Sequence, residues 1–173
     1  MVLVRRITAD DWELMRDVRL AALAEAPSAF GSSYAREVAF TQAQWRGRFS
    51  ERSVTFVAYD SADGPAGESA DFPAGGVVPA GLAGVYVEDT AADVVSVWVR
   101  PAFRGRGVGE ALIDSTAVWA TSRSFPALYL WVIETNAPAR RLYARCGFTP
   151  TGESQPLPSD PALTEIRMSR PLP

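Results

Sequence analysis

Residues 97–109 of the 173-residue chain read Val97-Trp98-Val99-Arg100-Pro101-Ala102-Phe103-Arg104-Gly105-Arg106-Gly107-Val108-Gly109. The β-branched and aromatic residues before Pro101 indicate the end of a strand. The proline and the glycines that follow mark a loop, and a helix is predicted from Val108 to about Ser122. The chain therefore passes from a strand, through a tight loop, directly into the start of a helix.

This segment belongs to a predicted β-α-β unit. Its strand, loop, helix and second strand are predicted at residues 94–99, 101–107, 108–122 and 128–133. A connection of this kind is a right-handed crossover between parallel strands. A further helix is predicted over residues 137–146, and Gly147 is placed to end it.

The rest of the chain predicts a mixed sheet. Further strands are predicted at residues 2–7, 54–59, 82–88, 148–152 and 163–168. One helix ends near Pro27, and another begins near Thr41 and carries Trp45 and Phe49. Residues 60–81 form either a solvated loop between paired strands or a functional flap. The predicted class is α/β, with a mixed central sheet of about six to seven strands and about four helices.

The composition excludes several kinds of chemistry. The chain has no histidine, all 17 of its basic residues are arginine, and Cys146 is its single cysteine. Histidine-based triads, Schiff-base lysines, Walker-type phosphate lysines and multi-cysteine zinc sites are therefore excluded. We interpret Cys146 as a small buried residue and not as a nucleophile, because no histidine could activate it.

Length, charge and hydropathy limit the classes of protein to which the chain can belong. The length predicts one domain, and a net charge of −3 gives little support for a nucleic-acid or anionic-membrane partner. No apolar run approaches the roughly 18 residues of a membrane span, and the N-terminus lacks the apolar core of a signal peptide. We expect a cytoplasmic protein that uses no metal, no membrane and no nucleic acid.

The loop before the predicted helix has the features of an anion site. Glycines allow backbone N–H groups to approach a ligand closely, and a helix N-terminus presents free N–H groups and partial positive charge. Arg104 and Arg106 add guanidinium groups suited to phosphate oxygens, so a diphosphate is the predicted ligand group. The alternative is a tight turn with solvated arginines.

The spacing of the loop distinguishes between phosphate sites. A Walker loop needs a lysine, which the chain lacks. A dinucleotide fingerprint starting at Gly105 would need glycine at its sixth position, which is Glu110. The spacing that fits is Arg-x-x-Gly-x-Gly, from Arg104 through Gly107 to Gly109.

Two motifs together resemble those of the GNAT superfamily of N-acetyltransferases. Residues 97–112 resemble its acyl-CoA-binding motif. Residues 136–148 are similar to its second motif, Asn-x6-Tyr-x3-Gly-Phe, which begins here at Asn136 and includes Tyr143. The motifs cover roughly a third of the chain, and the order of predicted elements before them also resembles the family.

The resemblance implies a single N-acetyltransferase domain over residues 1–173, with its cofactor motifs at about 94–148 and acceptor-shaping helices at about 10–50. Acetyl-CoA would be the co-substrate, lying where two parallel strands splay apart, and a primary amine would attack it directly. Tyr143 would be the general acid. The implied cofactor-binding residues are Val97, Trp98, Val99, Arg104, Gly105, Arg106, Gly107, Val108, Gly109 and Asn136.

Helical geometry supports a joint role for Asn136 and Tyr143. Seven residues at about 100° each bring them onto one face, two turns apart. A phenol with a pKa near 10 can protonate a thiolate whose thiol has a pKa near 8.5. The simpler interpretations are a helix N-cap for Asn136 and a packing residue for Tyr143.

The base that deprotonates the amine is less clearly indicated. The candidates are Asp93, Glu88 and Glu134, and Asp93 is preferred because many relatives carry a glutamate at that point of the strand. Some relatives place a catalytic glutamate where this chain has Trp131. Bulk water without a dedicated base is the remaining alternative.

The acceptor amine is not specified by the sequence. Residues 21–50 and perhaps 60–80 are expected to form its pocket, with Phe30, Tyr34 and Trp45 among them, and Trp98 and Trp131 either pack the sheet or wall that pocket. A small molecule or a peptide amine fits, and relatives commonly form homodimers. The alternative function is a non-catalytic acyl-CoA-binding or regulatory domain.

Overall fold

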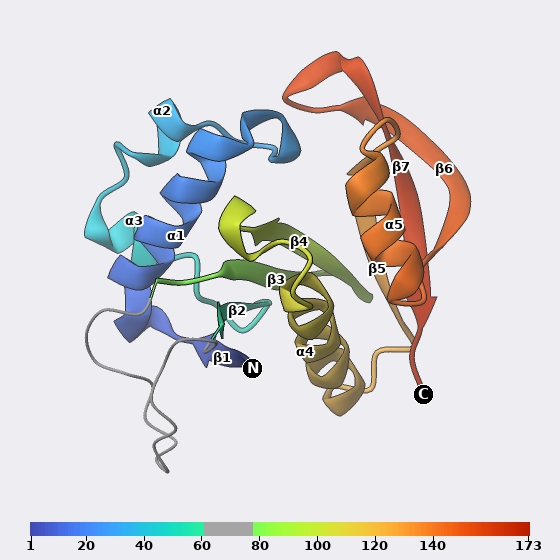
Figure 1. The fold of residues 1–173 in the computed structure, drawn as a ribbon, viewed down its shortest axis with the longest axis horizontal. Helices are drawn as coiled ribbons and strands as arrows, with labels where there is room; N and C mark the ends of the chain where they lie inside the picture. The colour runs from blue at the N-terminus through green and yellow to red at the C-terminus, as the bar shows by residue number, and fades with distance from the viewer. Residues whose placement is uncertain (61–77) are drawn as a thin grey trace.

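A computed structural model describes residues 1–60 and 78–173 of the chain. Its strands form a seven-stranded sheet in the order β1-β2-β3-β4-β5-β7-β6 (Figure 1). The strands are β1 (Val2–Ile7), β2 (Ser53–Asp60), β3 (Gly81–Glu88), β4 (Ala91–Val99), β5 (Ala127–Ile133), β6 (Thr149–Leu157) and β7 (Asp160–Pro171). The α-helices of the described residues are α1 (Trp12–Glu25), α2 (Tyr34–Glu37), α3 (Gln42–Arg46), α4 (Val108–Ser122) and α5 (Ala137–Arg145).

One parallel pair interrupts an otherwise antiparallel sheet. Strands β4 and β5 pair in parallel through Ala92 with Leu128 and Asp93 with Tyr129, and the ladder records no further pair between them in the described residues. All other neighbouring strands run antiparallel. The predicted mixed sheet and parallel crossover are therefore confirmed, and β4 and β5 separate after the two pairs at their N-terminal ends.

Helices cover the sheet from both sides. Residues of α1 pack with residues of β2, β3 and β4 in one apolar core, which includes Leu23, Trp45 and Trp98. Residues of α4 and α5 pack against the opposite face in a second core, which includes Leu112 and Tyr143. Figure 1 shows α1 to α3 on one side of the molecule and α5 lying along β5 and β7 on the other.

The N-terminal half departs from the prediction in one segment. The helix predicted from Thr41 to Phe49 spans only Gln42–Arg46, because Thr41 caps its start and the chain turns at Gly47. Phe49 lies beyond its end. An additional short helix, α2, forms between the two predicted N-terminal helices, with Ser33 accepting a hydrogen bond from the Arg36 amide. The described residues therefore contain five α-helices where about four were expected.

Other boundaries agree more closely. Helix α4 spans the predicted residues 108–122, and α1 ends before Pro27. The two C-terminal strands extend beyond their predictions, because they form one long hairpin. Most of the predicted loop at 60–81 lies outside the described residues. Across the two described ranges, no helix combines the length and apolar character needed to cross a membrane.

Candidate active site

The loop between β4 and α4 presents the start of a helix without a side-chain cap. Gly107 is the N-cap residue, with a left-handed φ of 81°. The first backbone bond of α4 runs from the Ala111 amide to the Gly107 carbonyl. The N–H groups of the first helical turn consequently have no partner within the helix and are available to an anion.

The glycines of this loop have two different roles. Gly105 and Gly107 have positive φ, and a Cβ at either would meet no atom within 4 Å, so the loop surface is open there. A Cβ at Gly109 would lie 2.9 Å from Leu142 Cδ2. Gly109 therefore permits the close approach of α4 to α5, whereas the two earlier glycines shape the loop itself.

A cavity of about 450 Å³ lies beside this loop. Strand β4, the start of α4 and helix α5 contribute to its wall, and so does the end of α1 through Glu25, Ala26 and nearby Ala29. The predicted site residues that line it are Val97, Trp98, Val99, Arg104, Gly105, Val108, Gly109, Asn136 and Tyr143. Arg106, Gly107 and Asp93 are not among the lining residues. The structure thus brings together residues from both sequence motifs.

The cavity fits a diphosphate that carries an extended arm. Its volume lies within the usual range for small-molecule sites, roughly 300–1,000 Å³. Beyond Asp93, β4 has no partner on β5 in the described ladder. The edge of β4 at Val97 and the Val99 N–H can therefore form hydrogen bonds with an extended ligand, as a sheet edge does with an added strand.

The two arginines of the loop are engaged with carboxylates of the chain. Arg104 donates from Nη2 to Glu25 Oε2 at 2.8 Å and from Nε to the Val99 carbonyl at 2.9 Å. Arg106 donates to Asp60 Oδ2 at 3.2 Å. Both arginines were predicted to bind a phosphate. In the structure Arg104 reaches the cavity with its charge paired, and Arg106 points elsewhere.

Glu25 is a site residue that the sequence analysis missed. A hydrogen bond from Trp98 Nε1, at 2.9 Å, and the contact with Arg104 lower the pKa of its carboxyl, although partial burial acts in the opposite direction. In the sequence it is only an acidic residue at a helix end. The signal that could have identified it is its place directly before the segment that ends α1 at Pro27.

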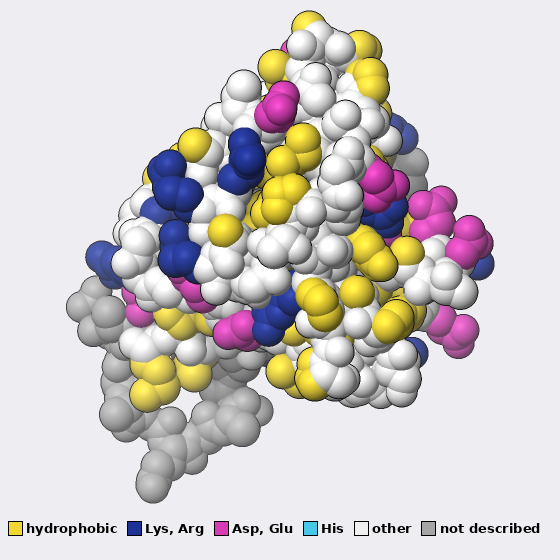
Figure 2. All heavy atoms as spheres, turned by 90° about the vertical axis from the view of Figure 1, so that its right-hand side faces the viewer, with side chains coloured by type: hydrophobic (Ala, Val, Ile, Leu, Met, Phe, Trp, Pro, Cys, Tyr) yellow, Lys and Arg dark blue, Asp and Glu magenta, His cyan; other side chains and the backbone are white. Residues whose placement is uncertain are grey.

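Arg145 was also missed. It lines the cavity at the end of α5 and donates to Glu110 Oε1 at 2.7 Å from Nη2. This hydrogen bond lowers the pKa of the Glu110 carboxyl. Figure 2 looks onto the C-terminal side of the molecule, where several basic side chains lie close together and acidic side chains lie both beside them and on the other part of this face.

Tyr143 has the protonation state that a hydrogen-bond donor needs. Its side chain is only 8% exposed, and burial together with nearby Cys146 raises the pKa of the phenol well above its usual value. Its ring packs edge-on against Phe148. Within the described residues its hydroxyl has no hydrogen-bond partner, so the proton is free to be donated toward the cavity.

Asn136 caps α5. Its side-chain oxygen accepts a hydrogen bond from the Ala139 amide at 3.2 Å, which is the capping role that the sequence left open. The side chain also lines the cavity, so its amide nitrogen can donate to a ligand. The two interpretations of Asn136 are compatible, and its role toward a cofactor stays a prediction.

Asp93 lies where β4 and β5 part. Burial raises the pKa of its carboxyl, while Arg167 at 3.7 Å acts in the opposite direction. Its Oδ1 has no hydrogen-bond partner in the described residues. Its neighbours Ala92 and Val94 belong to the core under α4, so Asp93 points to the opposite face. Its role as a base stays a prediction, as do those of Glu88 and Glu134, which also lie outside the cavity lining.

The other residues singled out in the sequence, two tryptophans and the cysteine, make packing contacts. Trp98 packs in the core under α1, and the Arg167 guanidinium lies 5.6 Å from the Trp131 ring centre. Burial raises the pKa of the half-buried Cys146, which disfavours a nucleophilic thiolate. Within residues 1–60 and 78–173, no group of three or more potential ligand side chains is placed to hold a metal ion.

Comparison with known proteins places this geometry in a family. The model of the acetyltransferase (GNAT) family matches residues 19–148. The chain is 40% identical over 58 residues to streptothricin acetyltransferase of Escherichia coli, which is 34% of this chain and 33% of that protein. The chain thus spans about a third of the length of that relative.

Solved acetyltransferase structures resemble this chain over larger parts of its length. The crystal structure of nourseothricin acetyltransferase is 31% identical with a TM-score of 0.56, covering 71% of this chain and 67% of that one. The PaiA N-acetyltransferase from Thermoplasma acidophilum, solved in complex with coenzyme A, has a TM-score of 0.66 at 11% identity and covers 99% of both chains, which shows the shared fold. On the family match and this fold, the chain belongs to the GNAT acetyltransferase family.

Proposed function

We propose that the protein is an acetyl-CoA-dependent N-acetyltransferase that transfers an acetyl group to a primary amine by direct attack in a ternary complex. The observation that carries the proposal is the cavity itself. It joins a free helix N-terminus, an unpaired edge of β4 and the protonated hydroxyl of Tyr143. These are the groups needed for a diphosphate, an amide-containing arm and a thiolate leaving group.

The residues have distinct roles in this proposal. The amides of the first turn of α4 bind the diphosphate, and the backbone of Val97 and Val99 pairs with the arm. A backbone N–H of β4 stabilises the negative charge that develops on the thioester oxygen. The bond between the amine nitrogen and the acetyl carbon forms as the bond from that carbon to sulfur breaks. Tyr143 gives its proton to the departing thiolate.

The amine loses a proton in the same reaction. We assign its acceptance to Asp93, because a carboxyl whose pKa is raised by burial is a better base than an exposed one. Asp93 stands where the two parallel strands part, on the face of the sheet opposite α4. An amine that approaches the gap from that face reaches the thioester without crossing the cofactor cavity.

The acceptor is proposed to be a small-molecule amine. Two of the named relatives are streptothricin acetyltransferase and nourseothricin acetyltransferase, so streptothricin belongs in the set of amines to be tested. The experiment is an acetylation screen over amine classes, with release of free coenzyme A as the readout, run beside the Tyr143→Phe variant. Amine-dependent thiol release that Tyr143→Phe reduces would support the proposal.

Two results would contradict it. Absence of calorimetric binding of coenzyme A and acetyl-CoA would remove its basis. Binding of coenzyme A without transfer to any amine, and equally in Tyr143→Phe, would favour a non-catalytic acyl-CoA-binding domain instead.

A further inference from the structure

Strand β4 contains an irregularity directly before the residues that line the cavity. On β3, Gly84 pairs with Val95 and Leu82 with Trp98, so two residues of β4, Ser96 and Val97, stand opposite one residue of β3. Ser96 has a φ of 58°, the left-handed conformation that glycine adopts more easily. The strand therefore has a bulge at Ser96, and a bulge re-aims the residues next to it.

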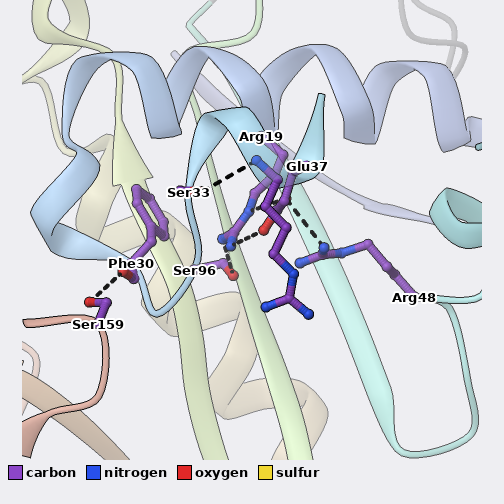
Figure 3. Close-up of polar contacts among 8 residues, drawn as sticks. Arg19, Phe30, Ser33, Glu37, Arg48, Ser96 and Ser159 are labelled. Carbon is purple, nitrogen blue, oxygen red and sulfur yellow. Dashed lines mark hydrogen bonds and ion pairs between the residues drawn. The ribbon is translucent and has the colours of Figure 1, made fainter. Parts of the chain in front are cut away.

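An arginine from a distant helix holds this bulge. Arg19 on α1 donates from Nη1 to Ser96 Oγ at 2.8 Å (Figure 3). Only 5% of the Arg19 side chain is exposed. A buried charged donor that lost this acceptor would be left unsatisfied, so the contact favours the position of Ser96 that the bulge provides.

The guanidinium of Arg19 is itself fixed from three sides. Its Nε and Nη2 donate to the two carboxylate oxygens of Glu37 at 3.0 and 2.9 Å. The Phe30 ring lies against it, 4.6 Å from ring centre to guanidinium carbon. Arg48 pairs with Glu37 from the other side at 3.3 Å, and Figure 3 shows the group converging on the bulge. A bidentate ion pair of this kind fixes the orientation of the arginine side chain, which a lysine cannot reproduce.

We propose that Arg19, oriented by Glu37, is a positioning residue for acetyl transfer: through Ser96 it fixes the bulge that directs the Val97 peptide N–H at the thioester carbonyl. This inference rests on the proposed function. Val97 lines the cavity and immediately follows Ser96. A backbone donor aimed at a developing negative charge acts through its orientation, and small displacements of such groups weaken catalysis strongly.

The test compares two substitutions at one position. Ser96→Ala removes the hydrogen bond and keeps a Cβ in the left-handed conformation, whereas Ser96→Gly removes the hydrogen bond but adopts that conformation freely. We expect Ser96→Ala to lower kcat roughly 10- to 100-fold and Ser96→Gly to lower it less, because glycine keeps the left-handed conformation without strain but lacks the hydrogen bond that fixes it. A purely structural hydrogen bond predicts the same loss in both variants.

Two further measurements do not depend on an acceptor. The infrared band of isotope-labelled acetyl-CoA reports hydrogen bonding to its carbonyl. We expect it at lower frequency when bound to the wild type and shifted back toward its free value in Ser96→Ala and Arg19→Lys. Affinity for coenzyme A, which lacks the acetyl group, is expected to stay at the wild-type value by calorimetry. Arg16→Lys is the matched control, because Arg16 is a more exposed arginine of the same helix that pairs with Asp17.

The outcomes separate the two proposals. If the wild type binds no acetyl-CoA or transfers to no amine, the proposed function fails and this inference fails with it. If the wild type transfers but Ser96→Ala and Arg19→Lys keep its rate and carbonyl band, only the inference is overturned. Equal losses in Ser96→Ala and Ser96→Gly overturn it as well, because they would assign the effect to the hydroxyl and not to the backbone conformation.

Discussion

Arg104 Nη2 donates a hydrogen bond of 2.8 Å to Glu25 Oε2, so a residue expected to serve a phosphate is already paired with a carboxylate in the cavity wall. Substituting Glu25→Gln removes a negative charge beside the anion site and frees Arg104. Because the pair is partly exposed, we expect coenzyme A to bind up to about fivefold more tightly at low salt. Calorimetry at two ionic strengths checks this. Glu13→Gln, at the exposed start of α1, is the control, and weaker binding in Glu25→Gln would show that the carboxylate holds Arg104 in its binding position.

Tyr143→Phe tests the proton donor. Its hydroxyl has no partner within the described residues, so we expect the free energy of unfolding to change by less than about 0.5 kcal/mol. We expect kcat to fall about 100-fold, because general acid assistance to the thiolate is lost. Steady-state thiol release and thermal unfolding measure the two effects. Tyr86→Phe, at a 44% exposed tyrosine on β3, is the matched control. An unchanged kcat would exclude Tyr143 as the acid.

Asp93→Asn tests the base. Since burial raises the pKa of this carboxyl above its ordinary 3.8, Asp93 accepts a proton only above that raised value, and kcat/KM should rise with pH through it. In Asp93→Asn we expect kcat/KM to fall roughly 100-fold and this acidic limb to disappear. A pH–rate profile measures both. Asp89→Asn, at an exposed turn residue, is the control, and a profile that is unaltered in Asp93→Asn would point to water, to Glu88 or to Glu134.

Gly109→Ala tests the contact between α4 and α5. The added Cβ would lie 2.9 Å from a methyl of Leu142, so we expect a loss of about 1–3 kcal/mol in unfolding free energy. Adding Leu142→Ala relieves the overlap, and the two changes together should destabilise less than the sum of their separate effects. Denaturant unfolding of the four proteins in this double-mutant cycle is the measurement. Strict additivity would contradict the contact.

Glu37 makes folding sensitive to acid. Burial alone raises the pKa of its carboxyl, but Arg19 and Arg48 outweigh it and the net pKa is lowered from the ordinary 4.5. Its stabilising contribution is therefore complete above pH 4.5 and is lost as the pH falls below that value. We expect Glu37→Gln to destabilise the protein by about 3 kcal/mol at pH 7.

The pH dependence provides the check on that prediction. The difference in stability between the wild type and Glu37→Gln should shrink as the pH is lowered, because the wild-type carboxyl then becomes neutral too. Urea unfolding at a series of pH values measures it. A difference independent of pH would mean that the ion pair contributes nothing.

The parts of the fold that follow from local rules were predictable. Helix α4 was located because a proline and several glycines mark the loop directly before it. The short helix α2 was not, because four residues give too little periodicity and its formation depends on the burial of Glu37.

The candidate site divides in the same way. Val97, Arg104, Asn136 and Tyr143 were found because they lie in two motifs of fixed spacing. Glu25 and Arg19 act across 79 and 77 residues of sequence, on Arg104 and on Ser96. Contacts of such separation are set by how α1 packs on the sheet, and no local pattern records them. The bulge was hidden for a further reason, since serine is not the residue expected at a left-handed position.

The junction of β4 and β5 has a consequence for how the whole molecule holds together. Two residue pairs make up the whole β4–β5 ladder in the described residues, and side-chain contacts such as those between α4 and α5 also join the two parts of the sheet. A ligand that hydrogen bonds to β4 and also contacts α5 connects the two parts of the sheet. Ligand binding between β4 and β5 and the association of these two parts of the sheet are thus thermodynamically coupled, and the free energy of unfolding is largest when the ligand is bound.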